Sequence, residues 1–102
     1  MNNQNNQNNE QFFIIRTDRA GVFYARIAER RGSEADLLDT RRMWYWSGAA
    51  SLSQLATEGV SKPRDCKFTV VVPSMTVLGV IEVIPVSDQA RATIEGVPEW
   101  RA

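Results

Sequence analysis

The apolar residues of this chain alternate with polar ones over its first half and change to a helical spacing near its middle. Residues 11–17 (QFFIIRT) form a compact run rich in Phe and Ile, which favours a strand. In residues 22–30 (VFYARIAER), one face of the alternating pattern holds Phe23, Ala25 and Ile27. Because side chains alternate between the two faces of a strand, the pattern predicts strands over 11–17 and 22–30, joined by a turn at 18–21.

A third strand is expected after a tight turn at residues 31–34. Residues 35–40 (ADLLDT) would return along residues 22–30, and the strand either continues or restarts through residues 41–46 (RRMWYW). If residues 41–46 form a strand, one face holds Arg42, Trp44 and Trp46. The other face holds Arg41, Met43 and Tyr45. One face should pack into the core and the other should form a surface, and the pattern leaves open which is which.

The spacing becomes helical after this aromatic run. An apolar stripe with helical spacing is formed by Ala49, Leu52, Leu55, Ala56 and Val60. Ser51 followed by Gln54 fits a capping box, Ser47 is a rival N-cap, and Gly59 suits the end of a helix. These signals predict the main helix at about residues 49–58.

The second half of the chain predicts two more strands and a short helix. Residues 67–73 and 77–86 are rich in Val and Ile, which suggests central strands joined through residues 73–75. A short C-terminal helix is expected at about residues 87–95, capped by the Ser-Asp pair at its start.

Taken together, the elements predict an α+β fold, with a strongly bent antiparallel sheet or a small open β-barrel and a helix covering one mouth or face. Residues 11–102 would form this single domain. Residues 1–10 consist almost entirely of Asn and Gln, so they are expected to be a disordered leader. A domain of this size is near the lower end for a self-sufficient core, so we expect a homo-oligomer.

Composition and charge exclude several classes of function. The chain has 12 Lys and Arg residues and 12 Asp and Glu residues, so its formal net charge is zero. The overall charge therefore gives no reason to expect binding to nucleic acid or to a membrane. The single cysteine, Cys66, has no partner for an intrachain disulfide, which favours a reducing cytoplasm. The chain has no histidine, so Ser–His–Asp and Cys–His sites and the common zinc sites are excluded. We therefore expect a protein that is not an enzyme and has no cofactor.

The densest recognition chemistry lies in residues 41–53 (RRMWYWSGAASLS), where two arginines precede three consecutive aromatics and a helix start. Aromatic faces stack on bases, guanidinium groups pair with phosphates, and free N–H groups at a helix start bind anions. The alternative is that the tryptophans belong to the core and the arginine stems pack at the strand edge. The candidate ligand-binding residues are Arg41, Arg42, Trp44, Tyr45, Trp46, Ser47, Ser51 and Ser53.

Residues 12–101 resemble a family of small, uncharacterised phage and prophage proteins, a domain of unknown function. The most specific part is the RRxWYWxGAASL motif at residues 41–52, and residues 93–100 (TIEGVPEW) also contribute. The resemblance implies a binding role in the cytoplasm of an infected bacterial host. It implies no catalytic residue.

Three functions are consistent with these observations. The first, suggested by analogy with phage proteins that sequester nucleotide signals of bacterial defence, is a sponge for a cyclic nucleotide or an ADP-ribose-type ligand. The second is a protein–protein interaction module, such as a host-factor inhibitor or a minor virion or assembly component. The third is a single-strand nucleic-acid binder of the small-barrel type, which the neutral charge disfavours.

Overall fold

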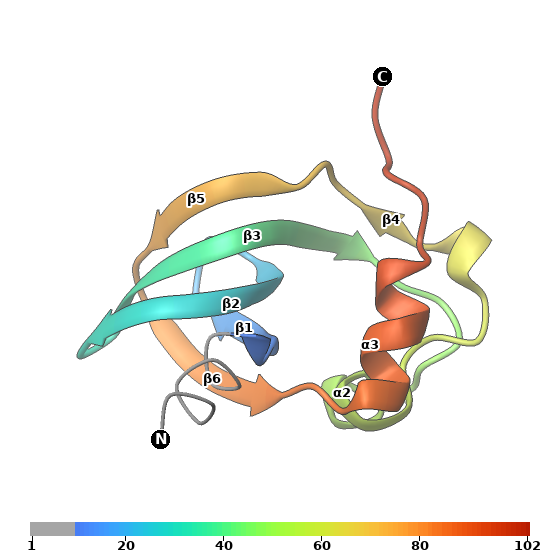
Figure 1. Cartoon of the computed structure of the whole chain (residues 1–102), viewed down its shortest axis with the longest axis horizontal. Helices are drawn as coiled ribbons and strands as arrows, with labels where there is room; N and C mark the ends of the chain where they lie inside the picture. The colour runs from blue at the N-terminus through green and yellow to red at the C-terminus, as the bar shows by residue number, and fades with distance from the viewer. Residues whose placement is uncertain (1–9) are drawn as a thin grey trace.

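The computed structural model describes residues 10–102, which form a bent antiparallel sheet and two helices (Figure 1). The strands are β1 (Phe13–Thr17), β2 (Val22–Arg31), β3 (Glu34–Tyr45), β4 (Lys67–Phe68), β5 (Val72–Val77) and β6 (Val80–Pro85). The helices are α2 (Leu52–Glu58) and α3 (Asp88–Glu95), with one turn of 3-10 helix at Pro63–Asp65. The expected leader at residues 1–10 lies, except for its last residue, outside the described residues.

The sheet has the order β4-β3-β2-β1-β6, and β5 pairs with β3 beside β4. The strands β5 and β6 belong to opposite edges of this sheet, yet only Leu78 and Gly79 separate them in the sequence. The two edges must therefore meet at this turn, and the sheet curls (Figure 1). This confirms the predicted α+β fold with a strongly bent antiparallel sheet.

The strand β3 is continuous but contains a bulge at Asp39. Asp39 has a φ of 51°, in the left-handed region that residues other than glycine rarely adopt. The register against β2 shifts by one residue between the pairs Tyr24–Arg41 and Arg26–Leu38. The Asp39 carboxylate accepts a hydrogen bond from Arg26 Nε at 3.0 Å, which ties the bulge to β2.

Because of the bulge, the buried side chains of β3 lie on one side of the sheet before Asp39 and on the other side after it. A one-residue shift moves all following side chains to the opposite face. Before the bulge, Leu37 packs with Phe23; after it, Met43 packs with Tyr24, which lies on the other face of β2. The two halves of β3 therefore contribute to two different cores.

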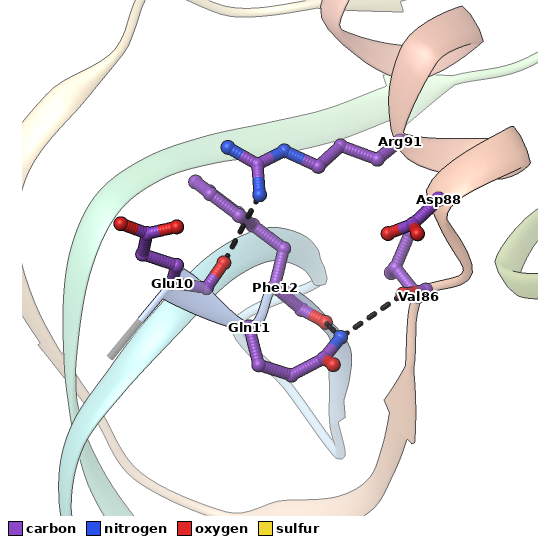
Figure 2. Close-up of a pocket in the computed structure, with 6 residues that line it drawn as sticks. All are labelled: Glu10, Gln11, Phe12, Val86, Asp88 and Arg91. Carbon is purple, nitrogen blue, oxygen red and sulfur yellow. Dashed lines mark hydrogen bonds between the residues drawn. The ribbon is translucent and has the colours of Figure 1, made fainter. Parts of the chain in front are cut away.

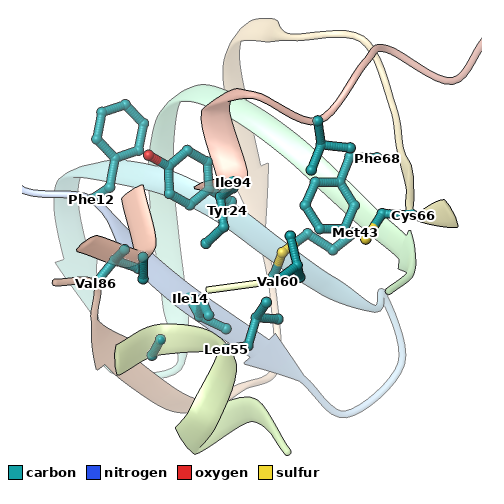
Figure 3. Close-up of a cluster of buried hydrophobic side chains, with 13 residues drawn as sticks. Phe12, Ile14, Tyr24, Met43, Leu55, Val60, Cys66, Phe68, Val86 and Ile94 are labelled. Carbon is teal, nitrogen blue, oxygen red and sulfur yellow. The ribbon is translucent and has the colours of Figure 1, made fainter. Parts of the chain in front are cut away.

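These two hydrophobic cores lie on opposite faces of β1 and β2. The helix-side core, shown in Figure 3, lies between the sheet and the helices and consists of Phe12, Ile14, Tyr24, Met43, Leu55, Ala56, Val60, Cys66, Phe68, Val86, Ala90, Ile94 and Val97. The hairpin-side core consists of Ile15, Phe23, Ala25, Ala35, Leu37, Val77 and Val80. Burial on both faces explains why β1 is an almost uninterrupted apolar run.

Side-chain caps fix where the helices begin. The Ser51 hydroxyl accepts a hydrogen bond from Gln54 N at 3.1 Å, so Ser51 rather than Ser47 is the N-cap. The main helix consequently begins at Leu52, three residues later than expected from the apolar stripe. The C-terminal helix begins after Ser87, whose hydroxyl accepts from Ala90 N at 3.0 Å. Neither helix in residues 10–102 has the length and apolar character needed to cross a membrane.

The expected connection at residues 73–75 is wrong. β5 runs through these residues, and the turn lies at Leu78 and Gly79 instead. Pro73 is tolerated because, among the described residues, β5 pairs only with β3, so the missing N–H falls on an edge strand. The same arrangement places β5 at an edge of the sheet, where the Val-rich run suggested a central strand. It also places β6 at an edge, which is one of the two positions that Pro85 allowed.

The start of the described chain is fastened to α3. Gln11 Nε2 donates to the carbonyl of Val86 at 2.9 Å, and Arg91 Nη1 donates to the carbonyl of Glu10 at 3.1 Å (Figure 2). The Arg91 guanidinium also lies over the Phe12 ring, with Cζ 4.7 Å from its centroid. The Gln11 amide and the Arg91 guanidinium, which line a small pocket of about 170 Å³ here, are thus already engaged with backbone carbonyls.

Candidate ligand-binding surface

The structure separates the candidate residues of the 41–53 segment, and Arg41 is the clearest case. Its side chain is buried, with 5% of the residue exposed. The guanidinium donates hydrogen bonds of 2.9 to 3.4 Å to the backbone carbonyls of Phe68, Thr69, Ile94, Val97 and Pro98. Burial lowers the pKa of this guanidinium. Because Arg41 is engaged with backbone carbonyls below the surface, we leave it out of the candidate surface.

The hydrogen bonds of Arg41 hold the chain after α3 against β4. Trp100 N donates to the carbonyl of Phe68 at 2.8 Å, and Glu99 forms an isolated parallel bridge with Phe68. Figure 1 shows this segment leaving α3 and passing β4 on its way to the C-terminus. The segment thereby acts as a short addition to the sheet, and it brings Trp100 beside β3.

Trp44, Trp100 and Lys67 form an exposed cluster that we call the aromatic surface. Trp44 is 66% exposed and Trp100 is 46% exposed. Their rings are nearly parallel, at 15°, with centroids 6.4 Å apart. Lys67 Nζ lies 5.5 Å from the centroid of the Trp100 ring. Two large, flat side chains and a cation are therefore presented together to solvent.

Arg42 lies on the exposed face of β3, as does Trp44, while Arg41 and Met43 are buried. The predicted alternation is thus confirmed from Arg41 to Trp44, with Arg42 and Trp44 on the exposed face. It is wrong for the last two residues, because Tyr45 is exposed and Trp46 is partly buried. The Arg42 guanidinium lies over the Phe23 ring, with Cζ 4.9 Å from the centroid. Its side chain lines a groove, described below, rather than the aromatic surface.

The remaining candidate residues have separate environments. Tyr45 is exposed at the end of β3, and Trp46 is partly buried against the helix-side core. Of the two alternatives for the tryptophans, exposure at the surface therefore applies to Trp44, and packing against the core applies to Trp46.

The three candidate serines surround the start of α2. Ser47 N donates to Cys66 Sγ at 3.4 Å, Ser51 caps the helix, and Ser53 is exposed on α2. The side chain of Gln54 accepts from Ala50 N at 2.7 Å. The N–H groups of Ala50 and Gln54, which a bound anion could have used, are already satisfied within the chain.

Sequence reasoning missed Lys67 as a site residue and left Trp100 without an assigned position. Both residues are far from Trp44 in the sequence and reach it only through β4 and the segment after α3. The sequence contained one sign of this role for Trp100: a tryptophan near the C-terminus that belongs to no amphipathic strand or helix.

The interior of the molecule offers little reactive chemistry. Cys66 is buried, and burial raises the pKa of its thiol. In this position Cys66 packs as a small apolar residue. Within residues 10–102, no three or more His, Cys, Asp or Glu side chains are grouped so that they could hold a metal ion.

Comparison with known proteins gives a family and nothing beyond it. A family model described as "Domain of unknown function (DUF6948)" matches residues 10–94. This region includes the RRxWYWxGAASL motif and ends before Trp100. No curated protein matches the chain, and no solved structure matches it.

Proposed function

Since the chain belongs to this family of unknown function, we propose its role from the surface itself: a non-catalytic protein that binds a flat, negatively charged ligand of the nucleotide type on the aromatic surface. The observation that carries this proposal is the exposed, nearly parallel pair of Trp44 and Trp100 with Lys67 beside it.

Exposed tryptophan pairs are well suited to stacking. Stacking of a base on an aromatic side chain contributes about 1–3 kcal/mol per base. The two indoles are held by the sheet and by the hydrogen bond of Trp100 N to Phe68, so little ordering remains to be done when a ligand binds. A ligand that covers both rings would remove their exposed apolar area from water.

Lys67 supplies the positive charge for the anionic part of the ligand. It forms no ion pair with any residue in the described part of the chain. Arg101, at the other side of Trp100, is paired with Glu99. A phosphate near Lys67 would therefore meet a cation that is not already neutralised by a carboxylate.

For the biological setting, we propose a protein of phage origin that withdraws a nucleotide signal from a host defence effector in the bacterial cytoplasm. Cyclic nucleotides and ADP-ribose derivatives combine a flat base with phosphate, which is the chemistry that the aromatic surface offers. A homo-oligomer fits this role, because a second copy could cover a ligand that one open surface leaves partly exposed.

The test is a thermal-shift screen against cyclic mono-, di- and trinucleotides and ADP-ribose derivatives. A ligand at about 100 times its Kd adds about 2.7 kcal/mol of stability, which raises the Tm of a domain of this size by more than about 10 °C. The Trp44→Ala variant should lose the shift, whereas Ile81→Ser, which changes an exposed apolar side chain of β6 at the far end of the sheet order from β4, should keep it. A flat screen with folded protein would contradict the proposal.

A protein–protein interaction module is the second candidate. Leu78 is 66% exposed and Ile81 is 54% exposed at the turn and edge formed by β5 and β6. Exposed apolar side chains at a sheet edge are typical of surfaces that contact other proteins. Recovery of one defined partner from host lysate, lost on Ile81→Ser and kept on Trp44→Ala, would favour this function over the first.

A further inference from the structure

A groove of about 620 Å³ lies between the β1–β2 turn and the β5–β6 turn, separate from the aromatic surface. It is bounded on one side by Asp18, Arg19 and Ala20, and on the other by residues 75–79. Arg42 of β3 also lines it. The backbone bond from Asp18 N to the carbonyl of Gly79, at 2.9 Å, links the two turns, so the groove is built on a fixed frame.

The groove carries a net positive charge, and one of its two cations is held in place. Neither Arg19 nor Arg42 forms an ion pair with another described residue. The Arg42 guanidinium lies over Phe23, which is fully buried, so its position is restrained. The only carboxylate that lines the groove is that of Asp18, which lies against Gly79. Two guanidinium groups and one carboxylate leave a single net positive charge.

The opposite wall of the groove is apolar. It contains the side chains of Met75, Val77 and Leu78, and Leu78 is 66% exposed. An exposed leucine beside an unpaired arginine suits a ligand that has both an apolar body and an anionic group. The exposed methyl groups of Leu78 would lose contact with water when such a body binds.

We propose that this groove is a second binding site, for a small organic anion with one negative charge and an apolar body. The anionic group would lie between Arg19 and Arg42, and the apolar body would pack on Met75 and Leu78. The single net charge of the groove matches a monoanion, either a carboxylate or a phosphodiester. The proposal does not depend on stacking at Trp44 and Trp100, because neither residue lines the groove.

The test uses three probes of similar apolar content on the full chain: hexanoate, dibutyl phosphate and 1-hexanol. Binding is followed by the backbone amide signals of residues 18–21 and 76–80 in two-dimensional NMR. We expect saturable shifts with one or both anions and none with 1-hexanol. Saturation by hexanoate alone would assign a carboxylate, and saturation by dibutyl phosphate alone would assign a phosphodiester.

Variants identify the residues that bind. Arg19→Gln and Arg42→Gln should each weaken anion binding about tenfold, because a hydrogen bond to a charged group is lost. Leu78→Ser should also weaken it, whereas Arg64→Gln, which removes an exposed arginine outside the groove, should not. If Arg42→Gln unfolds the domain, the Arg19→Gln variant still tests the proposal, because the Arg19 side chain is exposed and does not pack in either core. Equal binding of 1-hexanol, unchanged binding by Arg19→Gln, or no saturable shift in folded protein would overturn the proposal.

Discussion

Arg41 Nη1 donates a hydrogen bond to the carbonyl of Val97 at 3.0 Å, and this contact joins the middle of β3 to the segment that carries Trp100. The same guanidinium reaches the carbonyl of Phe68 in β4 at 3.1 Å. A buried cation that donates to backbone carbonyls thus positions an exposed aromatic side chain. The architecture of the aromatic surface depends on a side chain that does not belong to it.

Replacement of Arg41 should therefore destabilise the fold. In Arg41→Met, the five carbonyls lose their donor in a buried place, and we expect a loss of about 3 kcal/mol or more in the free energy of unfolding. Arg41→Lys keeps the charge but lacks the planar set of N–H donors of a guanidinium, so it should restore only part of the lost stability. Urea unfolding measures both. Arg64→Met, an exposed control, should stay within about 0.5 kcal/mol of the parent.

Trp44 and Trp46 should respond differently to truncation. Trp44→Ala removes a side chain that is 66% exposed, so we expect a loss of under about 1 kcal/mol. Trp46→Ala removes a ring that packs on the helix-side core and should cost about 2 kcal/mol, less than a fully buried tryptophan. Thermal unfolding of the two variants gives the comparison. Equal losses would mean that Trp44 is packed more tightly than its exposure indicates.

The sequence predicted what is determined locally. The alternation in β2 and the candidate caps at Ser51 and Ser87 each depend on a few neighbouring residues. The same pattern left open which face of residues 41–46 is exposed. The burial of Arg41 could not be predicted in the same way, since the acceptors of its hydrogen bonds come from β4 and from the end of the chain.

The position of the turns was also beyond local reasoning. Pro73 is a strong breaker in isolation, and it suggested a connection where β5 actually runs. Its tolerance depends on β5 lying at a sheet edge, which is a property of the whole topology. The bulge at Asp39 is a similar case, because an aspartate with positive φ has no distinctive sequence signal.

Two glycines with positive φ should differ sharply in their tolerance of a side chain. Gly32, with a φ of 61°, lies in the β2–β3 turn, and a Cβ there would have nothing within 4 Å. Gly59, with a φ of 82°, packs on α3, and a Cβ there would lie 3.1 Å from Ala90 Cα and 3.0 Å from Thr93 Cβ. Gly32→Ala should cost about 1 kcal/mol, from backbone strain alone.

The cost for Gly59→Ala should be about 3 kcal/mol or more, because Gly59, with φ 82° and ψ −155°, lies in a backbone region that is essentially restricted to glycine, and overpacking against α3 adds to this strain. Chemical denaturation of the two variants measures this difference. If both variants lose the same stability, α3 can move away from Gly59 without cost, and the α2–α3 contact is looser than the structure indicates.

The ion pair between Asp36 and Arg31 should make the β2–β3 hairpin sensitive to acid. Arg31 donates to the Asp36 carboxylate at 3.0 and 3.1 Å, and Thr76 of β5 donates to it at 2.8 Å. These hydrogen bonds, the one from Arg31 first, hold the pKa of Asp36 below its ordinary value. A carboxylate with a lowered pKa in the folded state stabilises the fold above its unfolded pKa, and this contribution disappears as the pH falls through the folded pKa.

NMR titration of the Asp36 carboxyl carbon should thus give a midpoint below that of an ordinary aspartate. Arg31→Gln should raise the midpoint, and Thr76→Val should raise it less, in the order of the two hydrogen bonds. The amide signals of β5 next to Asp36 should move with the same midpoint, since Thr76 connects the two strands. A midpoint that does not change in Arg31→Gln would show that the ion pair contributes nothing in solution, as is common for exposed pairs.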